Sequence, residues 1–252
     1  MNSSARIWLG LTLVSVGCAR GGQFGKPNVQ DQIKIGQRVA EDLRRTEKVL
    51  PLNDPHVIIL RRVATHVLSS IHDQEPWAFS FDVIDSPEVN AFSLPGGPTF
   101  FYTGLMDKLK SEDELAGILA HELTHVRMQH WAIQFASSQK RDLLINLGLL
   151  LSKANYALSE VAGLTNDIAF NLPFSRSEES QADQGGVKLV IQAGYNPNGM
   201  VSVFEMLSKT FGTAQELSFL SDHPSDKDRI RKLEGLIKDS NASFPPETPV
   251  TY

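Results

Sequence analysis

Cysteine is almost absent from this chain of 252 residues, which has one, Cys18, close to the amino terminus. No disulfide can therefore form within the chain. Structural zinc sites usually have four ligands, most of them cysteines. A single cysteine therefore also argues against a domain held together by structural zinc. A catalytic cysteine would have to be Cys18 itself, at the end of what looks like an export signal.

The chain also lacks an excess of basic charge and a long apolar run. Its net charge is −5 and its isoelectric point is about 5.8, whereas a general nucleic-acid binder normally has a basic surface. Nucleic acid is therefore not an expected partner. The apolar run LLINLGLLL (143–151) has nine residues, fewer than the roughly 20 that a membrane-spanning helix needs. It fits either a core helix or a flap over a site.

The amino terminus resembles an export signal. An apolar stretch from Ile7 to Gly17 is too short to span a bilayer but suits the apolar region of a signal peptide. The sequence SVGC that ends it resembles a bacterial lipobox, in which the cysteine is lipidated. Gly17 fits that pattern and Ser15 does not, because an aliphatic residue is usual three positions before the cysteine. We expect lipidation of Cys18, with a simply cleaved signal and a buried N-terminal helix as alternatives.

The rest of the chain is predicted to adopt an α+β fold that is mostly helical. Alternating aromatic and branched residues predict a strand over Ala78–Ser86, and NAFSLPGGPTFFYTG (90–104) predicts a hairpin that turns at Gly96 and Gly97. A loop without a catalytic part would fit this second segment equally well. Apolar periodicity predicts the helices: 29–49, 55–72, from Ser111 to beyond His130, 177–193, one after Pro197, and a last one within 221–239.

The helix from Ser111 carries the sequence HELTH, which spans His121, Glu122 and His125. Positions four apart share one helical face, so the two imidazoles can bind one metal ion. Glu122 lies roughly 100° around the helix axis, close enough to hold a metal-bound water without being a ligand. Zinc lowers the pKa of bound water, and a neighbouring carboxylate can take the proton as general base. A buried helix whose histidines only pack is the alternative.

A catalytic zinc ion normally has a third protein ligand. The metzincin pattern is excluded, because Met128 and Trp131 occupy its glycine and histidine positions and His130 is one residue out of register. His130 is therefore expected to be a helix-surface or packing residue. The sequence SRSEESQAD (175–183) offers Glu179 as a ligand, with Asp183 on the same helical face to accept a proton from a ligand histidine. Spacing favours Glu179 over Glu178 only because Glu178 has no acidic partner four residues later.

Five segments, in the chain order NAFSLPGG, HELTH, FSRSEESQAD, AGYNP and DHPSDKDRI, resemble the landmarks of the HtpX and CAAX-prenyl-protease family of zinc metallopeptidases. The similarity runs from Pro55 to Lys238 and is strongest to short BepA-like periplasmic members. It implies a zincin-like domain with a small sheet beside the HELTH helix and an edge strand at NAFSLPGG that binds extended substrate. It also implies that His223 lies near the zinc, stabilising an oxyanion or blocking the open position. Arg229 becomes a candidate for an ion pair in or near the site.

The resemblance has limits. The chain shows neither the tetratricopeptide repeats of some relatives nor the transmembrane helices of HtpX, so recruitment of partners by a repeat array has no support. Four segments are expected: a signal peptide (1–18), a flexible tether (19–30), the zinc metallopeptidase domain (31–238) and a disordered tail (239–252).

The sequence therefore predicts an exported, lipid-anchored zinc endopeptidase of the periplasm or cell envelope, which hydrolyses peptide bonds in unfolded or damaged proteins. Its partners would be unfolded polypeptides and, through Cys18, the membrane. The alternative is a chaperone-like or self-inhibited zinc-binding protein that cleaves little, because such a protein would keep every catalytic residue.

Overall fold

The computed structural model describes residues 26–137, 168, 174–210, 223 and 227–252. The expected signal peptide, most of the tether and the apolar run at 143–151 lie outside these residues. Within the described part, no helix has both the length and the apolar character needed to cross a membrane.

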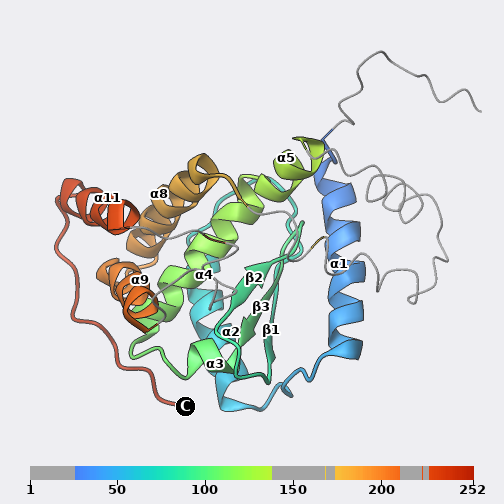
Figure 1. Cartoon of the computed structure of the whole chain (residues 1–252), viewed down its shortest axis with the longest axis horizontal. Helices are drawn as coiled ribbons and strands as arrows, with labels where there is room; N and C mark the ends of the chain where they lie inside the picture. Colours follow the sequence, from blue (N-terminus) through green and yellow to red (C-terminus); the bar gives the residue numbers. More distant parts are fainter. Residues whose placement is uncertain (1–25, 138–167, 169–173, 211–222, 224–226) are drawn as a thin grey trace, which may run out of the picture.

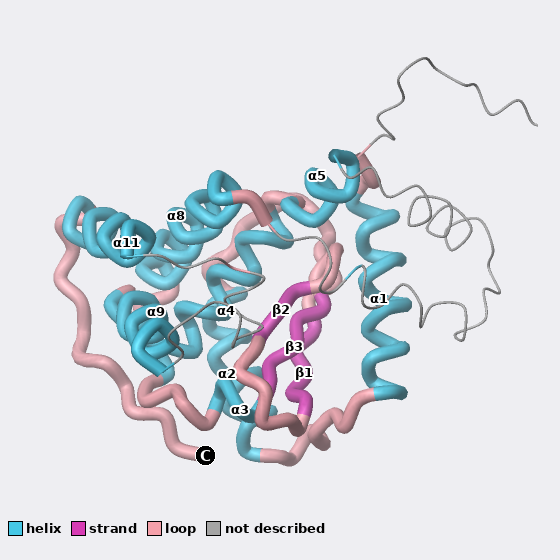
Figure 2. Tube along the Cα trace, in the orientation of Figure 1, coloured by secondary structure: helices cyan, strands magenta, loops and turns pink. Residues whose placement is uncertain are grey.

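Helices dominate the described chain, and they surround one small sheet (Figures 1 and 2). This arrangement confirms the α+β, mostly helical fold expected from the sequence. The elements are α1 (Val29–Thr46), α2 (Pro55–Leu68), β1 (Ser80–Ile84), β2 (Ala91–Ser93), β3 (Pro98–Tyr102), α3 (Thr103–Met106), α4 (Glu112–Arg127), α5 (His130–Ser137), α8 (Arg176–Gln192), α9 (Asn198–Thr210) and α11 (Lys227–Asp239).

The sheet has the order β1-β3-β2, with β1 parallel and β2 antiparallel to the central strand β3. The hairpin predicted over 90–104 is therefore present, and β2 is an edge strand. Its turn contains Gly96 with φ 81° and Gly97 with φ 134°, backbone conformations that glycine adopts without strain. A side chain at Gly96 would also collide with α1, because an added Cβ would lie 2.4 Å from Ile33 Cα.

Helix α4 crosses the centre of the molecule between the sheet, α2, α8 and α9 (Figure 1). The Ser111 side chain caps it by accepting a bond from the Glu114 amide, and every residue from Glu112 to Val126 is buried. Helix α8 packs closely against α4, since a Cβ on Gly185 would lie 2.4 Å from Thr124 Cγ2. This approach sets the acidic residues of α8 opposite the histidines of α4.

The prediction of one helix continuing past His130 is wrong. Helix α4 ends at Arg127, and α5 begins at His130 after a left-handed residue, Gln129, with φ 59°. The Gln129 side chain is held from α1, because Gln32 Nε2 donates to Gln129 Oε1 at 3.1 Å. The break changes the direction of the chain just after the HELTH sequence.

The final residues, 239–252, for which the sequence predicts a disordered tail, make contacts with the rest of the described chain. The last residues run in an extended conformation past the amino end of α4, where the Glu112 amide donates to Thr248 O at 2.8 Å. The Val250 amide donates to Lys110 O at 3.0 Å, and the Tyr252 ring stacks on His56 with centroids 4.3 Å apart. The amide groups at a helix start have no partner within the helix, so the tail gains bonds there that its polar composition does not reveal.

Candidate metal centre

Helices α4 and α8 bring together the metal-binding side chains expected from the sequence. One donor atom from each of His121, His125, Glu179 and His223 lies within 4.8 Å of the other three, and all four residues are buried. The two histidines of α4 are four residues apart and therefore share the face turned toward α8. His223 reaches the same point from the segment that precedes α11.

The rings of the α4 histidines point their Nε2 atoms at one another. His121 Nε2 lies 3.0 Å from His125 Nε2, and Glu179 Oε1 lies 3.4 Å from His125 Nε2. On the opposite side of its ring, His121 Nδ1 lies 3.2 Å from Asp183 Oδ1. Asp183 can therefore fix the proton of His121 on Nδ1 and leave Nε2 free to bind a metal ion.

His223 lies inside the cluster. Its Nδ1 is 2.9 Å from Glu179 Oε1 and 3.3 Å from His121 Nε2. Its Nε2 is 3.3 Å from Glu122 Oε1, and the residue is only 1% exposed. These contacts are incompatible with a histidine that merely occupies a surface turn.

Glu122 lies beside the four donors without being one of them. The side chain is buried, and its Oε1 makes no well-aligned hydrogen bond, although His223 Nε2 lies 3.3 Å away. Burial raises the pKa of Glu122, and the neighbouring His223 and His121 only partly oppose this effect. A buried carboxylate oxygen without a well-aligned hydrogen bond is costly unless a ligand or a water supplies one. The position suits a group that exchanges a proton with a molecule bound at the cluster.

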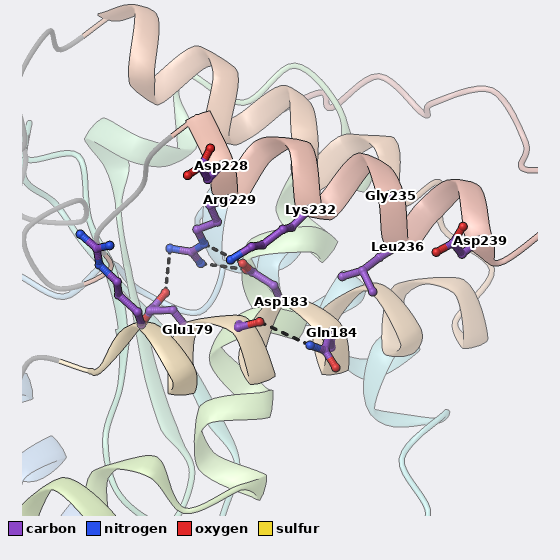
Figure 3. Close-up of a pocket in the computed structure, with 11 residues that line it drawn as sticks. Glu179, Asp183, Gln184, Asp228, Arg229, Lys232, Gly235, Leu236 and Asp239 are labelled. Carbon is purple, nitrogen blue, oxygen red and sulfur yellow. Dashed lines mark hydrogen bonds and ion pairs between the residues drawn. The ribbon is translucent and has the colours of Figure 1, made fainter.

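Arg229, on α11, forms ion pairs with two carboxylates of α8 (Figure 3). Its Nε lies 2.7 Å from Asp183 Oδ2, and its Nη1 lies 2.7 Å from Glu179 Oε2. Its guanidinium also lies over the Phe204 ring, with Cζ 4.3 Å from the centroid. The two ion pairs orient Glu179 and Asp183 toward the α4 histidines. Burial alone would raise the pKa of Asp183, but its bonds to His121 and Arg229 keep that pKa below its usual range.

The buried charges of the site fit a divalent cation. Glu122, Glu179 and Asp183 carry three negative charges against the one positive charge of Arg229, so two remain if the histidines are neutral. Burial alone would lower the pKa of His121, but bonds to Asp183 and Glu179 outweigh it and raise the pKa to about 9. Histidine nitrogens with one carboxylate oxygen match a transition metal better than calcium or magnesium.

The structure also distinguishes the two adjacent glutamates of α8. Glu179 points into the cluster, whereas Glu178 turns back to the start of its helix and accepts the Ser175 amide at 2.7 Å. The Ser175 hydroxyl in turn accepts the Glu178 amide, so the pair forms a capping box. The Gln134 side chain on α5 donates to the same Glu178 carboxylate.

Sequence reasoning missed the contact that His130 makes. Its Nδ1 lies 3.0 Å from His125 Nδ1, and it is fully buried. Spacing from the HELTH sequence predicts no such contact, because residues 125 and 130 lie on different faces of a continuous helix. The left-handed backbone at Gln129 turns the chain so that the His130 ring contacts His125.

A buried HELTH helix, a carboxylate ligand candidate from a second helix and a buried glutamate beside them define the class of the metallopeptidases. Residues 58–237 match peptidase family M48, and the chain belongs to that family.

Its relatives include two proteins named mitochondrial metalloendopeptidase OMA1. The one from Schizosaccharomyces pombe is 33% identical over 196 residues, covering 77% of this chain and 57% of that protein. The one from Arabidopsis thaliana is 28% identical, covering 92% and 47%. A putative beta-barrel assembly-enhancing protease of Vibrio cholerae is 26% identical over 211 residues, covering 80% and 43%. The chain thus spans about half the length of these curated relatives.

Proposed function

We propose that this protein is a zinc-dependent endopeptidase that hydrolyses peptide bonds within unfolded or damaged cell-envelope proteins. The supporting observation is the cluster of His121, His125, Glu179 and His223 within 4.8 Å, with Glu122 beside it as a carboxylate that is not a donor. Zinc is the natural occupant of a site that combines imidazole nitrogens with one carboxylate oxygen. Membership of peptidase family M48 supports the peptidase activity.

The residues divide the reaction between them. Zinc held by His121, His125 and Glu179 would polarise the scissile carbonyl and lower the pKa of a water molecule. Glu122 accepts a proton from that water and returns it to the leaving amine. His223 has its Nε2 on the side of Glu122, 3.3 Å from Oε1, where an N–H could stabilise the oxyanion that develops on the substrate.

The edge strand β2 supports an extended, unfolded substrate. The Leu94 amide bonds to Pro98 O across the hairpin at 2.7 Å. Because backbone bonds alternate along an antiparallel strand, the amide and carbonyl of Ser93 and Ala91 face the side of β2 that is not paired with β3. An added strand there would lie near Glu122, whose charged form a bond from the Ser93 side chain favours. An unfolded segment has the free backbone groups that such an added strand needs.

The first test is metal removal. A chelator should abolish the digestion of casein by the purified protein, and one equivalent of zinc should restore it, because the proposed chemistry needs the ion at the cluster. Digestion would be followed by the release of acid-soluble peptides. Cleavage that continues after the metal content has fallen to zero would contradict the proposal.

A second candidate function, a self-inhibited zinc-binding protein, rests on His223. Its Nδ1 is as close to the other donors as a ligand would be, 3.3 Å from His121 Nε2, so it could occupy the position that a substrate or water needs. The digestion assay separates the two functions. Stoichiometric zinc without cleavage, combined with suppression of casein aggregation, would favour the self-inhibited protein.

The proposed location is the cell envelope, with the membrane anchor at Cys18. The sequence pattern that ends at this residue supports the anchor, and the name of the Vibrio cholerae relative supports an envelope role. Replacement of Cys18 by serine should abolish incorporation of a labelled fatty acid during expression in bacteria, because serine has no thiol to be lipidated. An unchanged labelled band would exclude lipidation at this residue.

A further inference from the structure

If His125 binds zinc, only one of the two rings can donate the hydrogen bond between His125 and His130. The two Nδ1 atoms lie 3.0 Å apart between buried rings, which are 4.9 Å apart at their centroids and nearly perpendicular. Two imidazole nitrogens at this distance form a hydrogen bond only if one donates and the other accepts. Which of them donates depends on what the opposite nitrogen of each ring does.

The opposite nitrogen of His125, Nε2, points into the donor cluster, 3.0 Å from His121 Nε2. A nitrogen that binds a metal ion needs a free lone pair, so neutral His125 carries its proton on Nδ1. His125 therefore donates, and His130 Nδ1 accepts. This acceptance requires His130 to be neutral with its own proton on Nε2, a buried atom that has no hydrogen-bond partner among the described residues.

We propose that His130 is a positioning residue for the metal ligand His125, fixing both its tautomer and its ring orientation. The inference rests on the proposed zinc site. Ligand histidines usually donate to a carboxylate or a backbone carbonyl, as His121 does to Asp183. A neutral imidazole as acceptor for His125 avoids adding a fourth carboxylate to a site that already buries three.

The backbone break after α4 makes this contact possible. On a continuous helix, side chains five positions apart point about 140° away from each other. The left-handed Gln129, with φ 59°, ends α4 and returns His130 toward His125. Gln32 on α1 supports the turn, since its buried Nε2 bonds both Gln129 Oε1 at 3.1 Å and Pro27 O at 2.9 Å.

Two substitutions at His130 test the acceptor. Asparagine places its Oδ1 near the site of the histidine Nδ1 and can still accept, whereas leucine fills similar space without an acceptor. In the full chain, competition with a chromophoric chelator should show His130→Leu binding zinc about 10–100-fold more weakly than wild type. His130→Asn should remain within a few-fold of wild type. Equal affinity of His130→Leu and wild type, or equal losses in both variants, would overturn the inference.

Phe135→Leu is the packing control, because Phe135 is buried on the same helix α5. It should leave zinc affinity unchanged. A loss in this control as large as in His130→Leu would show that packing of α5, and not the acceptor, sets the affinity.

The positions of the protons on the two imidazole rings give a further test, because a residue that only packed against its neighbours would not determine them. Long-range proton–nitrogen correlation spectra of the zinc-loaded, ¹⁵N-labelled protein should show His130 protonated on Nε2 and His125 on Nδ1. A proton on His130 Nδ1 would refute the assignment. Because this measurement begins with zinc-loaded wild type, a wild type that binds no zinc refutes the proposed function instead.

Variants of Gln129 test the same contact without touching either histidine. Glycine adopts φ near 59° freely, whereas a β-branched residue does not. Gln129→Gly should keep wild-type zinc affinity, and Gln129→Val should lose affinity in the same way as His130→Leu. Equal affinities of these two variants would contradict a role for the left-handed turn.

Discussion

Replacing Glu122 by glutamine should lower the rate of casein digestion by about 10²–10⁴-fold, the usual contribution of a general base. The same variant should keep one zinc ion per chain, because the Glu122 carboxylate lies beside the four donors and is not one of them. Glutamine keeps the size of the side chain but cannot accept a proton at neutral pH. The measurement pairs metal analysis with the initial rate of peptide release.

The matched control for this substitution is Glu112→Gln, the same change on the same helix. Glu112 lies in the first turn of α4, where its Oε1 pairs with Arg62 at 2.7 Å, far along the helix from His121. The control should digest casein at the wild-type rate. Full activity of Glu122→Gln would remove Glu122 from the mechanism. Loss of its zinc would assign it a ligand role instead.

The parts of this site that sequence could predict are those set by local geometry. His121 and His125 share a helical face because they are four residues apart, whatever the rest of the chain does. Glu179 and Asp183 have the same spacing on α8, and the structure sets both against the α4 histidines. The hairpin before the site was equally local, since two glycines mark its turn.

The parts that sequence could not predict depend on contacts between distant segments. Gln129 takes a left-handed conformation without glycine or proline to signal it, and its partner Gln32 is 97 residues earlier. His223 reaches the cluster from 102 residues after His121, and only family resemblance suggested its place. The final segment has the polar composition of a disordered tail, yet its Thr248 amide donates to Asp113 Oδ2 at the start of α4, 135 residues earlier in the chain. Periodicity and local motifs carry no information about such pairings.

Glu179→Gln should lower zinc affinity by more than the roughly 100-fold upper range for residues that act through a ligand. Glutamine replaces an anionic oxygen with a neutral amide and leaves the positive charge of Arg229 balanced by Asp183 alone. The affinity would be measured by competition with a chelator of known strength. Metal content should fall together with peptidase activity, in contrast to Glu122→Gln.

Glu178→Gln is the control that makes this result specific, because it applies the same change one residue away. Its carboxylate accepts the Ser175 amide at the start of α8, so glutamine should keep that bond and lose only a charge near the helix amino end. The expected cost is about 0.3–1 kcal/mol of unfolding free energy, with zinc affinity unchanged. Equal zinc affinities for the two variants would refute Glu179 as the ligand. A loss confined to Glu179→Gln would show that the metal is held between α4 and α8, where Arg229 and Asp183 complete the charge balance.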